Sequence, residues 1–149
     1  MEPTKRIARA GARLALRLPI RVVCRESADF EWTEKSRLVD VNQFGAGLTL
    51  TRPVEVGRLI HLSMPLPHTL RCFDQFEPMY SIWSLVRHIS SITNVNVQEP
   101  PLFRIGVAFV GKRPPPSYEQ DPSARFQPIQ SRSGHSLLWK LAPAQPSSV

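Results

Sequence analysis

Arginine recurs at every fourth position near the N-terminus, at Arg9, Arg13, Arg17, Arg21 and Arg25. Residues four apart share one face of an α-helix, so this spacing by itself would indicate a basic stripe that is solvated or lies on something anionic. Pro19 argues against one continuous helix, because proline lacks a backbone N–H and pushes the preceding residue out of the helical region. The β-branched residues from Ile20 onward indicate a strand instead. We therefore interpret the arginines as spanning a mobile basic leader and a first strand.

Other residues that could carry chemistry form no recognisable catalytic or metal-binding pattern. The four histidines are scattered through the sequence, at His61, His68, His88 and His135. Cys24 and Cys72 are too few for a disulfide scaffold or a four-cysteine zinc site, and we expect both to be reduced packing residues. The glycines from Gly45 to Gly47 lack the rest of a phosphate-binding loop and are interpreted as turn residues. We expect no enzyme activity, no metal and no cofactor.

Composition and charge limit the class of protein. The chain has 149 residues, of which 42% are hydrophobic, and a mean hydropathy of -0.19, which suits one globular domain with tails. No apolar run reaches the roughly 18 residues that a membrane span needs, and no secretory signal is evident, so we expect a cytoplasmic protein. The formal charge of +7 favours an anionic partner such as a nucleotide, a nucleic acid or a membrane surface.

Short alternating apolar segments from residue 17 to residue 110 predict the elements that must position these side chains. In one of them Ile105, Val107 and Phe109 alternate with Arg104, Gly106 and Ala108, as expected for a strand with one buried face. Six such strands are predicted, at residues 20–25, 36–42, 47–52, 58–64, 82–91 and 103–110. The spacing predicts an all-β protein, a small six-stranded antiparallel β-barrel, with the loop at 65–79 packing across one mouth.

The sequence changes character after Gly111. Prolines, serines and glutamines become frequent and apolar residues sparse, which is typical of disordered or draped chain. We divide the chain into a flexible N-terminus at 1–8, a β domain at 9–111 and a Pro-rich, mostly disordered tail at 112–149. A short helix is predicted at 136–141, and truncation of the tail is expected to leave folding nearly unchanged.

Three short motifs stand in a characteristic order. The segments RLALRLPIRV, DVNQFGAGLTL and FRIGVAFV begin at Arg13, Asp40 and Phe103. Together they resemble the PilZ domain family, which has an RxxxR motif before its first strand, a [D/N]xSxxG motif after a later strand and a closing strand of the form "riGveF". The resemblance covers residues 9–111. It implies a six-stranded barrel that binds the bacterial second messenger cyclic di-GMP, with no cofactor.

Within this resemblance the leader arginines match the RxxxR motif. Arg13 and Arg17 are the implied ligand-binding residues, with Arg9 as a supplementary one. The planar guanidinium of arginine can pair bidentately with phosphate or with guanine O6 and N7, and can stack on the base. Arg21 and Arg25 are expected to be strand residues that face solvent. Because the leader is rich in small residues and like charges, we expect it to become ordered only when ligand binds.

The second motif supplies the remaining implied site residues, Asp40, Asn42 and Gly45. Asp40 and Asn42 are two apart and are expected to project from the same face of a strand, where a carboxylate can accept hydrogens from guanine N1 and N2. Gly45 would allow a tight turn and a close approach of the ligand. Asn42 stands where the family usually has serine.

Three functions are compatible with the sequence. The first is a sensor that binds cyclic di-GMP and relays binding to an unidentified partner protein. The second is a degenerate PilZ-like adaptor that contacts proteins without binding nucleotide. The third is a basic barrel that binds nucleic acid. This last function is disfavoured, because aromatic residues do not interleave with cations along a strand face.

Overall fold

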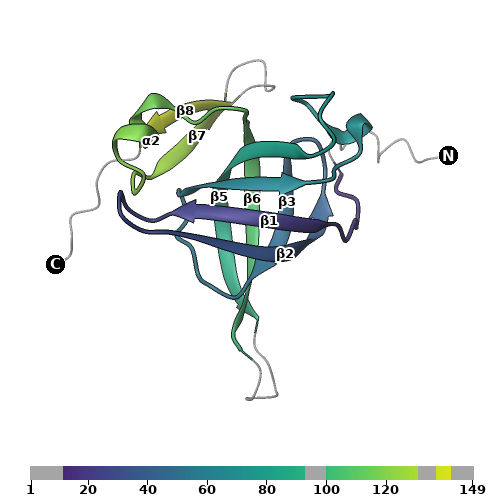
Figure 1. Ribbon diagram of the computed structural model, residues 1–149, viewed down its shortest axis with the longest axis horizontal. Helices are drawn as coiled ribbons and strands as arrows, with labels where there is room; N and C mark the ends of the chain where they lie inside the picture. The colour runs from purple at the N-terminus through teal and green to yellow at the C-terminus, as the bar shows by residue number, and fades with distance from the viewer. Residues whose placement is uncertain (1–11, 93–99, 131–136, 142–149) are drawn as a thin grey trace.

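The computed structural model describes residues 12–92, 100–130 and 137–141, in which six strands close into an antiparallel barrel (Figure 1). Around the barrel the order is β1-β2-β3-β6-β5-β4, and β4 pairs with β1 to complete it. The strands are β1 (Pro19–Arg25), β2 (Glu31–Val41), β3 (Gly45–Leu50), β4 (Leu59–Met64), β5 (Tyr80–Ile92) and β6 (Leu102–Gly111). The predicted fold class is confirmed, and each predicted strand is present, β2 beginning earlier than expected.

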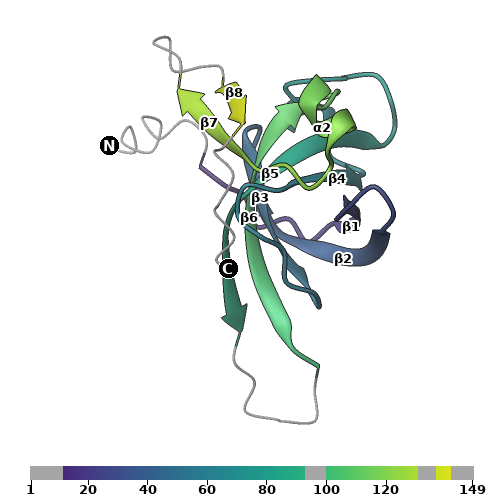
Figure 2. The same cartoon turned by 90° about the vertical axis from the view of Figure 1, so that its left-hand side faces the viewer.

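The core fills the barrel with alternate strand residues. Ile105, Val107 and Phe109 of β6 are buried, as the alternation predicted. Tyr80 at the start of β5 is wholly buried and meets the Phe109 ring edge to face, with centroids 6.1 Å apart. The C-terminal part of β5 extends past the end of its pairing with β4 and pairs with the N-terminal part of β6, which also pairs with β3 (Figure 2).

The loop between β4 and β5 contains the short 3₁₀-helix η1 (His68–Leu70) and is organised by one buried arginine. Arg71 is 4% exposed and lies 5.1 Å from the centroid of the Tyr80 ring. Its guanidinium donates to four backbone carbonyls, those of Leu66, Asp74, Glu77 and Pro78. These bonds satisfy the buried donors and fix the path of the loop.

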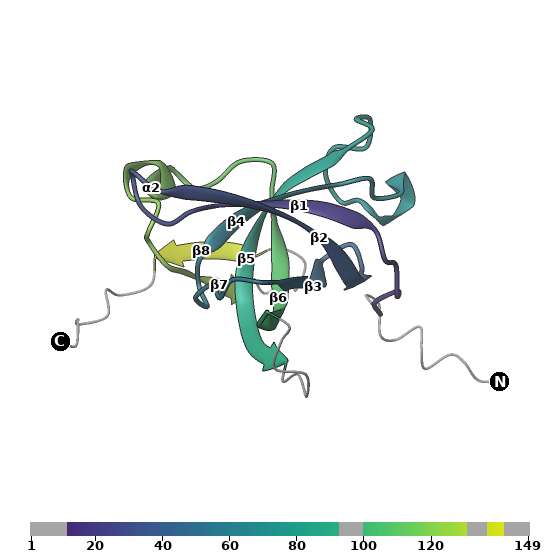
Figure 3. The same cartoon turned by 60° about the horizontal axis from the view of Figure 1, so that its bottom comes forward.

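The described part of the C-terminal segment is draped over the barrel. It contains α2 (Pro116–Gln120), β7 (Phe126–Gln130) and β8 (Leu137–Leu141). Tyr118 and Phe126 are each 3% exposed and pack with Leu59 and Leu85, which belong to β4 and β5. Figures 1 and 3 show α2 at the end of the barrel away from the leader. Tyr118 and Phe126 therefore attach this segment to the barrel. They stand singly among prolines and form no periodic apolar pattern, so the sequence does not indicate the attachment.

The helix predicted at 136–141 is wrong. Residues 137–141 form β8, which pairs antiparallel with β7 in the register Pro128 opposite Trp139. The backbone partner that makes a strand favourable is β7, a separate segment of the chain, which local sequence does not reveal. Among the described residues, no helix is long and apolar enough to cross a membrane.

Candidate functional site

The leader reaches the barrel beside the end of β2. Leu14 forms a two-way backbone bridge with Val41, through N···O distances of 2.8 and 2.9 Å. This bridge holds Arg13 close to Asp40 and attaches the described part of the leader to the barrel. Arg9, the supplementary site residue of the sequence analysis, lies outside the described residues.

Asp40 faces outward because β2 contains a bulge. Leu38 pairs with Leu48, and Asp40 with the next residue of β3, Gly47, so the register shifts between Leu38 and Asp40. In a regular strand these two residues would share one face. The bulge breaks that alternation, which leaves Leu38 and Val41 fully buried and the Asp40 side chain 27% exposed.

The Asp40 carboxylate lies between two guanidinium groups. Arg13 Nη1 is 3.3 Å from Oδ1, and Arg104 Nη2 is 3.5 Å from Oδ2. Arg13 belongs to the leader and Arg104 to β6, so Asp40 joins the first and third sequence motifs. The arginine side chains are 37% and 42% exposed, and partly exposed pairs at such distances contribute at most about 1 kcal/mol each. An anionic ligand can therefore rearrange them at low cost.

Glycines form the surface beneath these side chains. Asp40, Gly47, Gly106 and His88 lie opposite one another in a row across β2, β3, β6 and β5. A Cβ atom at Gly47 would lie 2.7 Å from Asp40 Oδ1, and one at Gly106 would lie 2.3 Å from His88 Nε2. The carboxylate and the imidazole thus rest on bare backbone, on a surface formed by neighbouring strands.

Gly45 also lies under a charged side chain. A Cβ atom there would be 3.4 Å from Arg13 Nη2, and only 2.3 Å from the carbonyl oxygen of Val107 on β6. The second contact involves backbone, which cannot move aside. Close packing of β3 on β6 therefore requires glycine at this position, in addition to the close approach of ligand that the sequence suggested.

Asn42 shapes the turn between β2 and β3. Its Oδ1 accepts hydrogen bonds from the backbone N–H groups of Phe44, at 2.7 Å, and Gly45, at 2.9 Å. β2 ends at Val41, so the expectation that Asp40 and Asn42 project from one strand face is wrong. Asparagine is suited to this position because its short side chain can bond to the backbone two and three residues ahead.

Arg17 is placed differently from Arg13. Its side chain is exposed, and its backbone carbonyl accepts a 3.5 Å hydrogen bond from Arg37 Nη1. In the described part of the chain, no ion pair joins Arg17 to Asp40. Arg21, farther along β1, is also exposed, as expected for a strand residue that faces solvent.

Sequence reasoning missed the roles of Arg104, His88, Gly47 and Gly106. Arg104 and Gly106 lie in the third motif, but only strand register places them beside Asp40 and His88. The resulting surface offers guanidinium donors, one carboxylate acceptor and one imidazole over flat backbone, which suits a ligand with phosphates and planar bases. Within the described ranges no group of acidic residues, cysteines and histidines could hold a metal ion.

Comparison with known proteins finds likeness in structure alone. No family model matches the chain, and no curated protein matches its sequence. The PilZ domain of YcgR from Escherichia coli with c-di-GMP is 18% identical, over 74% of this chain and 82% of that one, with a TM-score of 0.47. PlzA from Borreliella burgdorferi in complex with c-di-GMP is 8% identical, over 74% of this chain and 50% of that one, with a TM-score of 0.48.

A further match is the inhibitor of motility MotI/DgrA from Bacillus subtilis. It is 12% identical, over 74% of this chain and 45% of that one, with a TM-score of 0.47. The chain thus spans about half the length of MotI and PlzA. With identities this low, the likeness concerns the shape of the barrel alone.

Proposed function

We propose that this chain is a PilZ-like, non-catalytic protein that binds cyclic di-GMP on the surface formed by the leader, β2, β3 and β6. The observation that carries the proposal is the position of Asp40, between Arg13 of the first motif and Arg104 of the third. Residues far apart in sequence, in motifs that resemble one family, meet at one carboxylate. The glycines beneath them let the Asp40 carboxylate and the His88 ring lie directly on the backbone, where a ligand could contact both.

The chemistry of each group suggests its role. The Asp40 carboxylate would accept hydrogens from N1 and N2 of a guanine, and the guanidinium of Arg13 would pair with a phosphate or the O6 and N7 edge. Arg17 is exposed and would supply a second cation from the leader. Asn42 would act indirectly, by holding the turn between β2 and β3.

Binding would change the leader. Arg13 and Asp40 now pair with each other, so a dianionic ligand that engages both must separate them. The leader would then shift while Leu14 stays bridged to Val41, and the altered surface would be recognised by a partner protein. The partner is unidentified.

A protein adaptor without nucleotide is the second candidate. The observation that favours it is that both Asp40 oxygens already have arginine partners. Such a chain would keep the ion pairs as a structural link between the leader and β6. Direct titration with cyclic di-GMP decides between the two functions.

Calorimetric titration with cyclic di-GMP would test the proposal. Arg13→Ala and Arg17→Ala should each weaken binding roughly tenfold or more, because a charge-assisted hydrogen bond contributes about 1.5–3 kcal/mol. Arg21→Ala is the matched control, which removes the same formal charge and should cost only a small, salt-sensitive loss. The double variant of Arg13 and Arg17 should bind no measurable ligand.

A parallel titration with single-stranded nucleic acid at the same salt concentration tests the third function, a basic barrel that binds nucleic acid. Tighter binding of nucleic acid than of cyclic di-GMP would contradict the proposal. So would equal losses in the Arg13, Arg17 and Arg21 variants, which would reduce the leader to a general electrostatic patch. No binding of cyclic di-GMP by the wild-type protein would favour the adaptor.

A further inference from the structure

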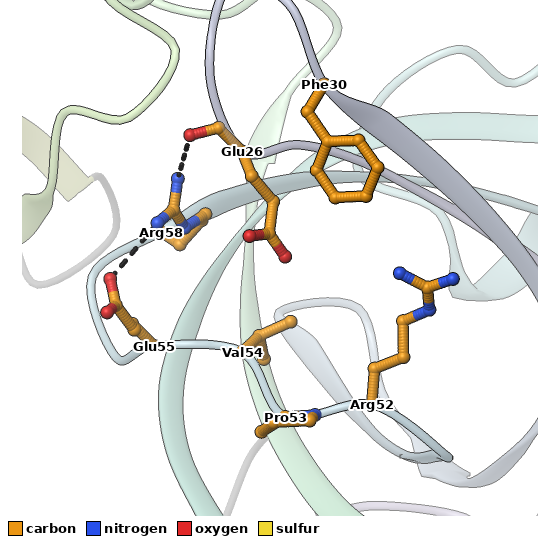
Figure 4. A pocket seen from close by; sticks show the side chains of 7 residues that line it. All are labelled: Glu26, Phe30, Arg52, Pro53, Val54, Glu55 and Arg58. Carbon is orange, nitrogen blue, oxygen red and sulfur yellow. Dashed lines mark hydrogen bonds and ion pairs between the residues drawn. The ribbon is translucent and has the colours of Figure 1, made fainter.

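A hollow lies at the end of the barrel away from the leader. β1 runs from Pro19, beside the leader, to Arg25, and the hollow begins just beyond it, between the β1–β2 turn and the loop from β3 to β4. Its volume is about 580 Å³, within the range of small-ligand sites. Figure 4 shows the Glu26 carboxylate, the Phe30 ring and the Arg52 guanidinium turned toward the same space. This hollow shares no residue with the surface around Asp40.

One tryptophan positions the two charged groups. Trp32 Nε1 donates a 2.7 Å hydrogen bond to Glu26 Oε2, and the Arg52 guanidinium lies 4.8 Å from the centroid of the Trp32 ring. Trp32 is 5% exposed, so it is a fixed support. A hydrogen bond and a cation–π contact thus hold an anion and a cation on two sides of the hollow.

The other charges at the rim are already paired. Arg58 is 8% exposed and donates to Glu55 Oε1 at 3.1 Å and to the carbonyl oxygen of Glu26 at 3.4 Å. Glu55 Oε1 also lies 2.6 Å from Arg125 Nη2. In contrast, Arg52 and Glu26 form no ion pair with each other in the described part of the chain. The second Glu26 oxygen and the Arg52 donors therefore remain to be used by an occupant.

An apolar wall adjoins these groups. Phe30 is 49% exposed although it is a large hydrophobic residue, and Val54 is buried beneath the hollow at 6% exposure. The exposed Phe30 ring gives the hollow an apolar surface beside the two charged groups. The hollow thus combines one donor group, one acceptor group and an apolar wall.

We propose that this hollow binds an extended peptide segment of a partner protein. A peptide amide has the matching chemistry, since its carbonyl oxygen accepts from Arg52 while its N–H donates to Glu26. A neighbouring apolar side chain of the segment packs on Phe30 and Val54. A carboxylate pairs with Arg52 but is repelled by Glu26, and an ammonium pairs with Glu26 but is repelled by Arg52, whereas a neutral amide can bond to both side chains without repulsion. The proposal is independent of cyclic di-GMP binding.

Chemical-shift titration of the full-length ¹⁵N-labelled protein, without nucleotide, tests this proposal. The probe is N-acetyl-leucinamide, which carries amides and one apolar side chain. We expect saturable shifts at Glu26, Phe30 and residues 52–58, except at Pro53, which has no N–H. Isovalerate, with a carboxylate, and isoamylammonium, with a cation, should each bind more weakly. Stronger binding of either comparator, or no saturable shift with the amide, overturns the proposal.

Variants then identify the residues responsible. Arg52→Gln and Glu26→Gln should each weaken binding of N-acetyl-leucinamide roughly tenfold, the size of one charge-assisted hydrogen bond. Glutamine at position 26 still offers an oxygen to Trp32, so the fold is retained, and unchanged signals of β5 and β6 verify this. Arg21→Gln, on the exposed face of β1, is the matched control and should bind as the wild type does. Equal affinity in all the variants overturns the proposal.

Discussion

The Asp40 carboxylate rests on Gly47, where a Cβ atom would come within 2.7 Å of Oδ1. Gly47→Ala should therefore displace the carboxylate while the barrel stays folded, because the atom that must move is the end of a side chain. We expect affinity for cyclic di-GMP to fall roughly tenfold, the size of one lost charge-assisted bond. Calorimetry measures the affinity, and thermal unfolding should show a change of no more than about 1 kcal/mol.

The same substitution at Gly106 tests the other end of the row. There the Cβ atom would meet the His88 ring at 2.3 Å, so Gly106→Ala should displace the imidazole and leave Asp40 in place. A smaller loss of affinity than for Gly47→Ala is expected if Asp40 is the main guanine acceptor. Unchanged affinity in Gly47→Ala would contradict the role given to Asp40.

Asn42 should act on binding through the turn between β2 and β3. Asn42→Ala removes the acceptor for the N–H groups of Phe44 and Gly45, and we expect it to lower the free energy of unfolding by about 1–2 kcal/mol. Asn42→Ser keeps an oxygen acceptor and should lose less than half of that. Urea denaturation gives the stabilities. If position 42 acts only through the turn, the affinity for cyclic di-GMP should fall in the same order as the stability, from wild type to the serine variant to the alanine variant. An alanine variant as stable as the wild type would contradict the role of Asn42 in the turn.

The C-terminal segment should stabilise the barrel, which reverses the expectation from its composition. Tyr118 is 3% exposed, against Leu59 and Leu85, and its ring lies 5.0 Å from that of Trp83. Tyr118→Ala should cost about 2–3 kcal/mol in the free energy of unfolding, the order expected for uncovering a large side chain. Ser123→Ala, in the same segment but exposed, is the control. A truncation after Gly111 that unfolds at the wild-type urea concentration would show that the contact contributes nothing.

His61 should make the protein less stable in mild acid. Burial lowers the pKa of His61 below its ordinary 6.5, and the charges of Lys112 and Arg21 lower it further. Below pH 6.5, His61 is protonated in the unfolded chain but stays neutral in the folded protein. The free energy of unfolding therefore decreases as the pH is lowered, until the folded-state pKa of His61 is reached. Above pH 6.5 both states are neutral and the effect vanishes.

Urea denaturation at pH 7, 6 and 5 measures this dependence. His61→Gln should flatten it, and the difference between wild type and variant isolates His61 from other titrating groups. The pKa of Asp74 is also lowered, chiefly by its hydrogen bond with Lys112, but from an ordinary value of 3.8, so it acts only at lower pH. Parallel curves for wild type and variant would contradict the assignment.

The barrel was predictable because each strand carries its own signal. Ile60, Leu62 and Met64 are buried and alternate with the half-buried His61 and Ser63, and this period follows directly from the geometry of a strand with one buried face. The pairing of β7 with β8 was not predictable in this way. The sequence of β8, LLWKL, fits a helix or a strand, and only its contact with β7 decides.

The site was predictable in part for a related reason. Arg13, Asp40 and Gly45 lie in recognisable motifs, and the structure places them beside one another. Arg104 and His88 join them through strand register, which depends on the bulge in β2 and on the pairing of β5 with β6. Sequence spacing does not fix either of these.

The loop between β4 and β5 has an unusual freedom to vary. Arg71 recognises it through carbonyl oxygens alone, and every amino acid carries the same oxygen. Exposed side chains of this loop, Phe76 among them, could therefore be exchanged while the loop keeps its course. Lysine could not replace Arg71, because a single ammonium cannot span four carbonyls. Arg71 thus sets much of the loop's course, which leaves exposed positions such as Phe76 free to evolve, or to be redesigned, as a display surface.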